Sequence, residues 1–245
     1  MSRRCQALWT PRRGHRSEEY EDAFAINEAS GRFAMADGAS EGCFTGLWAK
    51  LLVNHFVRDS VLPVEKWTRT LTTPQEQWNE NIHANALPWY AEDGVEQGAF
   101  AAFLGLVFTQ ESVDGLSWQA TAIGDVCLFH TRQKSLLKAF PIDRSVHFNN
   151  FPVLIGSCSP TETIQKKQQL WNNGRGQTGD RLWIMTDALA SWCLMEIEAN
   201  RSPWHDFDSA LSQSPPQDAF TTWIESLRDH GQLRNDDVTL MLIEL

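Results

Sequence analysis

The sequence predicts an α+β protein: a central antiparallel β-sandwich with α-helices packed outside it. Strand-like apolar runs outnumber helical runs, and most neighbouring runs are joined by hairpin-like turns such as Ser30-Gly31. The chain has 245 residues, 42% of them hydrophobic, which suffices for one domain with a substantial core. We therefore expect residues 1–245 to form a single domain.

Apolar periodicity places the individual elements. The expected helices are 43–58, 75–83, one after Asp187, and 218–228, which Gly231 ends. The expected strands are 22–27, 32–37, 101–109, 118–123, 126–131, 135–140, 181–186 and 238–245. We expect the four strands between residues 101 and 140 to form one meander, with Gly124-Asp125 as a two-residue turn. Residues 174–180 are expected to be a glycine-rich loop.

Composition excludes several classes of function. Lys and Arg number 21 against 31 Asp and Glu, and the resulting charge of −10 argues against nucleic acid or an anionic membrane as the main partner. The five cysteines are widely spaced with no Cys-x-x-Cys pair, which predicts reduced thiols. Because no signal segment or membrane-spanning run occurs, we expect a cytoplasmic protein.

Carboxylates recur where apolar strands begin or end. They are Glu21-Asp22, Asp37-Gly38, Asp187 and Asp236-Asp237. Singly, each pattern is typical of a turn, a helix N-cap, a strand cap or a solvated charge run. Strand ends share a rim in a layered fold, and two carboxylates about 4 Å apart repel by roughly 4 kcal/mol at an effective dielectric of 20. Converging acids would therefore need cations, and Mg²⁺ and Mn²⁺ prefer such oxygen ligands.

Five short segments match a known family in chain order. The segments are Glu21-Asp22-Ala23, Ala36-Asp37-Gly38, Ile123-Gly124-Asp125, Thr186-Asp187 and Asn235-Asp236-Asp237-Val238-Thr239. Together they resemble the metal-dependent protein phosphatases of the 2C type, over a span from about residue 14 to the C-terminus. The strength of the match lies in this ordered spacing, because each short motif alone is weak.

The resemblance implies a signalling Ser/Thr phosphatase with two Mn²⁺ or Mg²⁺ ions at one end of a β-sandwich and a phosphoprotein as substrate. A water bridging the ions would attack the phosphoserine or phosphothreonine. Asp37 would bridge both ions, while Glu21 and the Gly38 carbonyl would hold one of them. Asp187 and Asp236 would hold the other ion.

Two further acids have implied roles: Asp22 would orient metal-bound water, and Asp125 would serve a third ion. This third ion should bind weakly, because Ala188 follows Asp187 where many members have glycine, and Ser191 stands where another acid is common. Residues 59–98 match no motif, so we expect substrate choice to reside in such unmatched parts of the chain.

The phosphate-binding arginine is less sharply defined. Arg16 lies near the family's position for this residue, but one residue farther from Glu21-Asp22 than usual. Arg12 and Arg13 are alternatives, and an exposed surface role for Arg16 stays open. His15 is a candidate acid for the leaving alkoxide, although a loop histidine is more often simply solvated.

Two other functions compete with the phosphatase hypothesis. Residues 38–42 fit G-x-S-x-G, and Asp206 and His230 follow in hydrolase order, so Ser40 could be a serine-hydrolase nucleophile. The motif comes too early in the chain for an α/β-hydrolase sheet. The second alternative is a catalytically weak phosphoprotein-binding module of the same fold. The G-x-G-x-x-G pattern at 174–179 is rejected as a dinucleotide site because a strand follows it.

Overall fold

The computed structural model describes residues 4–40, 42–58, 64–84, 95, 97–112, 115–149, 152–161 and 169–245. Contacts divide the chain into two compact units. Unit 1 comprises Met1–Tyr20, Cys127–Asn150 and Gly176–Leu245, and unit 2 comprises Glu21–Val126 and Phe151–Arg175. Each unit has one antiparallel sheet and its own helices, so the predicted α+β fold class is confirmed.

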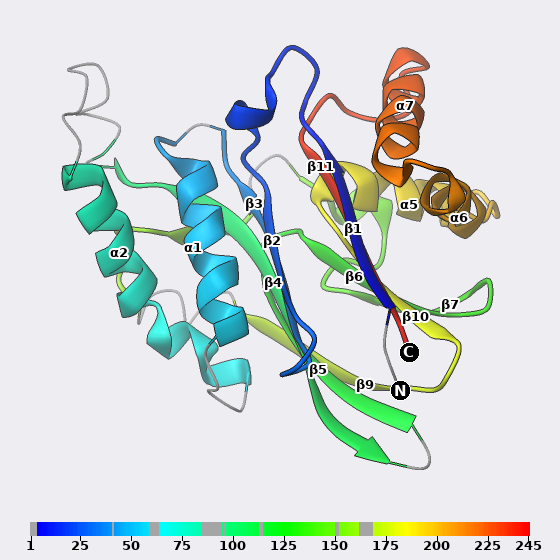
Figure 1. Cartoon of the computed structure of the whole chain (residues 1–245), viewed down its shortest axis with the longest axis horizontal. Coiled ribbons are helices and arrows are strands. Elements are labelled where there is room, and N and C mark those ends of the chain that lie inside the picture. Colours follow the sequence, from blue (N-terminus) through cyan, green and yellow to red (C-terminus); the bar gives the residue numbers. More distant parts are fainter. Residues whose placement is uncertain are drawn as a thin grey trace. The chain divides into compact units, whose positions relative to one another are not determined.

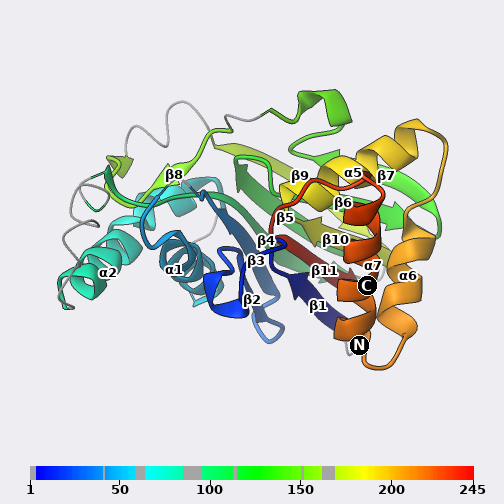
Figure 2. The ribbon, with the colours of Figure 1, turned by 90° about the horizontal axis from the view of Figure 1, so that it is seen from above.

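Unit 1 contains a five-stranded sheet in the order β1-β11-β10-β6-β7. Its strands are β1 (Arg4–Thr10), β6 (Cys127–Arg132), β7 (Ser135–Phe140), β10 (Asp180–Met185) and β11 (Val238–Glu244). Its helices are α5 (Asp187–Glu198), α6 (Trp204–Ser212) and α7 (Pro216–Asp229), with 3-10 turns η1 (Ser17–Glu19) and η4 (Ser145–His147). Figure 2 shows α5, α6 and α7 gathered beside this sheet.

Aromatic packing joins the helices of unit 1 to its sheet. The Trp183 ring of β10 lies 5.8 Å from that of Trp204 and 5.3 Å from that of Phe207, both on α6. These residues belong to a single buried cluster that also includes Phe220 and Ile224 of α7. The apolar face predicted for residues 218–228 is therefore the face that α7 buries.

Unit 2 contains a six-stranded sheet in the order β2-β3-β4-β5-β9, with β8 paired to β4. The strands are β2 (Ala23–Asn27), β3 (Arg32–Gly38), β4 (Phe100–Ser112), β5 (Gly115–Ile123), β8 (Ile155–Gly156) and β9 (Leu170–Gly176). The helices are α1 (Thr45–Arg58) and α2 (Thr72–His83), preceded by the 3-10 segment η2 (Val64–Thr70). In Figure 1, α1 lies along β2, β3 and β4, and α2 lies beside α1.

Close packing fixes α1 on this sheet. The Trp67 ring stacks on Phe103 of β4 at 4.2 Å, and Phe56 of α1 meets both rings edge-on. A Cβ on Gly105 would lie 2.5 Å from the Phe56 ring, so glycine is needed where α1 crosses β4. The predicted hairpin at 22–37 and the helix at 43–58 are both confirmed by β2, β3 and α1.

Two sequence-based predictions are wrong. The strands between residues 101 and 140 do not form one meander, because β4 pairs with β5 in one sheet and β6 pairs with β7 in the other. Gly124 (φ +92°) is not in a hairpin turn but on the link between the units, where a Cβ would lie 2.5 Å from that of Ala102. Residues 174–176 are not a loop but the end of β9, where the Trp118 ring excludes a Cβ on Gly174.

Some elements were not predicted, and part of one segment lies outside the described residues. Neither β1 nor α6 was expected from the sequence. Within residues 59–98, the structure does not describe 59–63, 85–94 or 96. None of the helices in the described ranges is both long and apolar enough to cross a bilayer.

An ion cluster around the buried Asp180 anchors the start of β10. Asp180 accepts hydrogen bonds from Arg132 (2.7 and 2.9 Å), from His130 Nε2 (2.9 Å) and from the Gln177 N–H (2.9 Å). Burial alone would raise the pKa of Asp180, but these hydrogen bonds outweigh it and lower the pKa to about 2.

We expect this cluster to make stability depend on pH. The folded-state pKa of Asp180 is depressed, so its contribution is complete above the unfolded value near 3.8 and is lost as pH falls through about 2. The contribution should be about 2 kcal/mol, and Asp180→Asn should remove it. Urea unfolding of both proteins between pH 6 and pH 2 measures the difference. The exposed Asp143→Asn is the control, and an Asp180→Asn difference that stays constant across this range would contradict the assignment.

Candidate functional site

The acids of unit 2 lie at one edge of its sheet. The strand registers align one row of residues across four strands, which is Ala23, Ala36, Phe103 and Ile123. Glu21 and Asp22 directly precede this row, Asp37 directly follows it, and Asp125 comes two residues after it. Antiparallel pairing therefore brings acids from distant parts of the sequence to the same sheet edge.

The Glu21 carboxylate is held from both sides by hydroxyl groups. Thr45 Oγ1, at the start of α1, donates to Oε1 at 2.5 Å, and Ser40 Oγ donates to Oε2 at 2.8 Å. Glu21 is partly exposed, whereas the neighbouring Asp22 and Asp125 are buried. A buried carboxylate lowers the stability of the fold unless it is paired or coordinates a metal ion. The buried acids at this edge therefore need partners of one of these kinds.

Gly38 is required by its surroundings and not by a turn. It is the last residue of β3, and a Cβ there would lie 2.8 Å from the Glu21 carbonyl oxygen and 3.1 Å from Thr45. The Asp37-Gly38 pair thus ends a strand that packs closely against the segment carrying Glu21.

The acids of unit 1 also lie at one edge of its sheet. Asp187 begins α5 directly after β10, and Asp236 directly precedes Asp237 and β11. The backbones of Thr186 and Thr239 are joined by a hydrogen bond of 3.2 Å, which holds the ends of the two strands together. The Thr239 N–H also donates to Thr186 Oγ1 at 3.0 Å.

An arginine joins the two acids of this edge. Arg234 Nη2 donates to Asp187 Oδ2 and lies 3.2 Å from Asp236 Oδ2. Burial, followed by repulsion from Asp187, raises the pKa of Asp236, and Arg234 acts in the opposite direction. Asp187 Oδ1 is buried and accepts no hydrogen bond from the described residues. The edge is therefore an oxygen-rich site whose negative charge calls for a cation.

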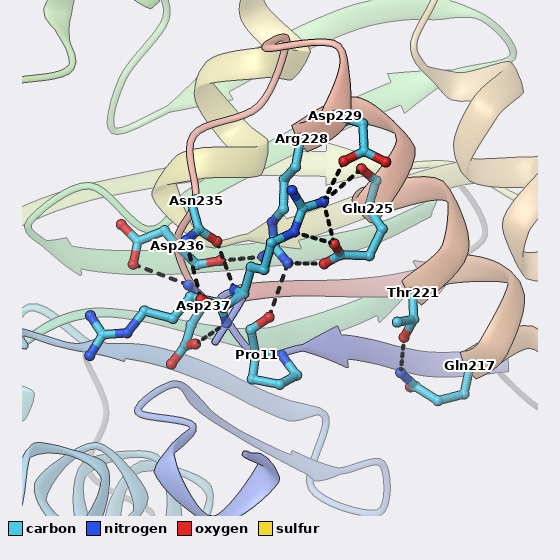
Figure 3. A network of polar contacts seen from close by, with 11 residues as sticks. Pro11, Gln217, Thr221, Glu225, Arg228, Asp229, Asn235, Asp236 and Asp237 are labelled. Carbon is cyan, nitrogen blue, oxygen red and sulfur yellow. Dashed lines mark hydrogen bonds and ion pairs between the residues drawn. The ribbon is translucent and has the colours of Figure 1, made fainter. Parts of the chain in front are cut away.

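A buried arginine of α7 positions the loop that carries Asp236. Arg228 donates from Nη2 to the Asp236 carbonyl (2.5 Å), and from Nη1 to the Pro11 carbonyl (3.0 Å) and Glu225 Oε1 (2.5 Å). Figure 3 shows this side chain reaching from the helix to both chain segments. Arg228 thus fixes the approach to β11 relative to the end of β1.

Two further contacts bind the same segments together. The Arg12 N–H donates to Asp237 Oδ1 and the Arg13 N–H donates to Asn235 Oδ1, each at 2.7 Å. Asp237 and Asn235 therefore hold the segment that precedes Arg16 (Figure 3).

The structure distinguishes the three candidate arginines. Arg13 is bound by Glu225 (2.5 Å) and Asp229 (2.8 Å), and these hydrogen bonds raise its pKa. The Arg12 Nε donates to the His15 ring at 3.0 Å. Arg16 forms no side-chain ion pair with the residues that the structure describes, and its N–H donates to Glu19 Oε2 at 2.8 Å. Arg16 therefore has the guanidinium best able to receive an anion.

The serine-hydrolase alternative does not fit the structure. Every described strand register is antiparallel, whereas an α/β-hydrolase requires a mainly parallel sheet. Ser40 donates its hydroxyl hydrogen bond to Glu21, and His230 Nδ1 lies 2.7 Å from the Ser226 carbonyl at the end of α7. Asp206 lies on α6 beside His205.

The residues around the acids were not found by sequence reasoning. Ser40 was singled out only as a possible nucleophile and not as a partner of Glu21, and Thr45 had no signal apart from its proximity to Asp37-Gly38 in the chain. The sequence did contain a signal for Arg228. This residue follows Leu227 on the apolar side of a helix, where a charged side chain needs buried partners. Arg234 lies two residues before Asp236, but no motif in the sequence marked it as a partner of the acids.

The residues at both edges fit a hard divalent cation in donor type. In the described part of the chain, no three His, Cys, Asp or Glu side chains gather closely enough to form a metal site by themselves. The available donors are nevertheless carboxylate and carbonyl oxygens, which Mg²⁺ and Mn²⁺ prefer. The buried Asp187 Oδ1 is an orphaned acceptor that a cation would satisfy.

Comparison with known proteins reveals similarity in structure. No protein-family model and no curated protein sequence matches the chain. The Mycobacterium tuberculosis serine/threonine phosphatase PstP/Ppp is 14% identical with a TM-score of 0.62, covering 99% of this chain and 98% of that chain. The catalytic domain of PstP in complex with two manganese ions is 14% identical with a TM-score of 0.61, covering 99% and 97%. PppA, described as a key regulatory component of T6SS in Pseudomonas aeruginosa, is 15% identical with a TM-score of 0.56, covering 100% and 98%.

We expect Gly38→Ala to destabilise unit 2. The added Cβ would overlap the Glu21 carbonyl and the Thr45 backbone, and relieving such overpacking costs about 1–3 kcal/mol. Urea unfolding followed by circular dichroism measures this loss. An unchanged unfolding midpoint would show that β3 can move away from the Glu21 carbonyl and Thr45 without loss of stability.

We expect Arg228→Met to destabilise unit 1 by about 2–4 kcal/mol, because buried partners lose their donors. The matched control is Arg201→Met, which removes an exposed arginine paired with Glu196 and should cost less than about 1 kcal/mol. Equal losses in the two variants, measured by thermal unfolding, would refute a specific role for Arg228.

Proposed function

The chain has the fold of the metal-dependent protein phosphatases of the 2C type, and from this premise we propose that it is an active Ser/Thr phosphatase. Its proposed reaction is the hydrolysis of phosphoserine or phosphothreonine in a protein substrate, with Mn²⁺ or Mg²⁺ as cofactor. The observation that best supports this proposal is the pair Asp187 and Asp236 at the edge of unit 1. The repulsion between these two acids is countered by the cationic Arg234.

The metal-binding residues of the proposal come from both sheet edges. In unit 2 they are Glu21, Asp37 and the carbonyl of Gly38, and in unit 1 they are Asp187 and Asp236. Asp125 is proposed for the weaker third ion. When bound, two such cations lower the pKa of water and neutralise charge on the phosphoryl group, so that no covalent enzyme intermediate is required.

Other side chains of the chain orient the reactants. Asp22 is proposed to accept a hydrogen bond from the attacking water, and Arg16 to donate paired hydrogen bonds to the phosphate. His15 is proposed to donate a proton to the leaving alkoxide. The hydroxyls of Ser40 and Thr45 support this arrangement because they fix the Glu21 carboxylate in one orientation.

A regulatory setting is also proposed. PppA is described as a regulatory component, and another solved structure with a TM-score of 0.55 and 16% identity is described as part of the bacterial stressosome. These similarities support a phosphoprotein partner in signalling for this chain.

The proposal predicts metal-dependent hydrolysis of p-nitrophenyl phosphate and of a phosphothreonine peptide. Turnover should require Mn²⁺ or Mg²⁺, stop in excess EDTA and survive a serine-reactive inhibitor. Asp37→Asn and Asp187→Asn should each reduce kcat/KM by roughly 100-fold or more, because each removes a charged oxygen ligand. The exposed Asp143→Asn serves as the control for a change of charge alone.

Each other outcome has a distinct meaning. Unchanged metal-dependent turnover in either Asn variant would refute the two-ion assignment. Ester hydrolysis indifferent to EDTA would refute the metal-dependent mechanism. The absence of turnover, with metal still raising the melting temperature, would favour the phosphoprotein-binding module.

A further inference from the structure

Arg234 occupies an unusual place among the acids of unit 1. Its Nη2 atom hydrogen bonds to Asp187 Oδ2 and lies 3.2 Å from Asp236 Oδ2, so that one nitrogen serves two carboxylates. These are the two residues of this unit that the proposed function assigns to a metal ion. A guanidinium and a divalent cation therefore have the same two carboxylates as ligands.

The surroundings allow this guanidinium to leave. The Arg234 side chain is 48% exposed, whereas that of Asp187 is only 13% exposed. The two acids are fixed by other contacts, since Asp187 starts α5 and the backbone of Asp236 is held by Arg228. Arg234 is thus the most exposed of the three side chains, since that of Asp236 is 34% exposed.

The charges at this edge favour replacement of Arg234 by a metal ion over simultaneous binding of both to the two acids. Arg234 brings one positive charge to two carboxylates, and the third acid nearby, Asp237, is engaged by the Arg12 N–H. A divalent cation between Asp187 and Asp236 would neutralise both acids, whereas a guanidinium beside it would be repelled. Arg234 and a metal ion would therefore exclude each other.

We propose that Arg234 is an internal counter-ion of the metal site, which holds Asp187 and Asp236 in the metal-free protein and must withdraw when a divalent cation binds. This inference rests on the proposed function. Arg234 then sets metal affinity: it stabilises the metal-free protein and weakens the apparent binding of metal by the same factor. The metal concentration that half-fills the site would therefore be higher than in the same protein without this arginine.

The direct test is Mn²⁺ binding measured by isothermal titration calorimetry on the full chain and on Arg234→Gln. Removing the competitor should lower the Kd for Mn²⁺ by about 3- to 10-fold. It should also lower the melting temperature of the metal-free protein and enlarge the rise in melting temperature that Mn²⁺ produces. Arg201→Gln, in which an exposed ion pair of the same unit is lost, should change neither the Kd for Mn²⁺ nor the rise in melting temperature that Mn²⁺ produces.

A second measurement follows Arg234 in the wild-type protein itself. The Arg234 Nε–Hε signal in a ¹⁵N NMR spectrum, assigned by its loss in Arg234→Lys, should shift toward the position of a solvated arginine as Mg²⁺ is added. A signal that keeps its metal-free position at saturating Mg²⁺ would overturn the proposal.

The outcomes separate the two claims. If the wild type binds Mn²⁺ and Arg234→Gln binds it equally or more weakly, the counter-ion role is wrong while the proposed function stands. If the wild type binds no metal but Arg234→Gln does, the counter-ion role is supported in its strongest form. If neither protein binds Mn²⁺ or Mg²⁺, both the counter-ion role and the proposed metal-dependent function are overturned.

Discussion

Repulsion between carboxylates gathered at the ends of strands is the constraint on which the rest of the site depends. Burial and then the charge of Asp187 raise the pKa of Asp236, because a second negative charge is unfavourable at this edge. Arg234 counters them from solvent, and Arg228 holds the backbone so that Asp236 cannot move away. In unit 2, the Glu21 carboxylate is instead held by the hydroxyls of Ser40 and Thr45. The protein thus keeps its acids in place by neighbouring donors.

Antiparallel register places acids that are dispersed in the sequence at a shared sheet edge. Glu21, Asp37 and Asp125 are far apart in the chain, yet each lies just beyond one row of paired residues in the sheet of unit 2. The glycine at position 38 permits the close approach of β3 to the segment before β2. Phe56 of α1 and Trp67 of η2 then pack together against Phe103 of β4, which fixes the sheet. Strand pairing therefore determines where the acids of the sheet edge lie, and their side-chain chemistry determines what they can bind.

Local signals predicted much of the fold, and the failures have physical causes. The hairpin of β2 and β3, the helix α1 and the helix α7 followed from strong periodicity with clear turn or stop residues. A turn signal at Gly124 could not reveal that β6 joins a different sheet from β5, because sheet membership depends on distant pairing. Gly174 looked like a loop residue, but it is a strand residue beneath the Trp118 ring. The acids could be named from the sequence, whereas the partners of Arg228 and Arg234 depend on contacts across the folded unit.

The most direct test of the central claim is a crystal structure of the protein grown with Mn²⁺, with anomalous diffraction measured at the manganese edge. The account predicts anomalous peaks in direct contact with the carboxylates of Asp37, Asp187 and Asp236, and an Arg234 side chain turned away from the two acids. Manganese peaks confined to other residues, or crystals from saturating Mn²⁺ in which Arg234 still joins Asp187 and Asp236, would contradict it.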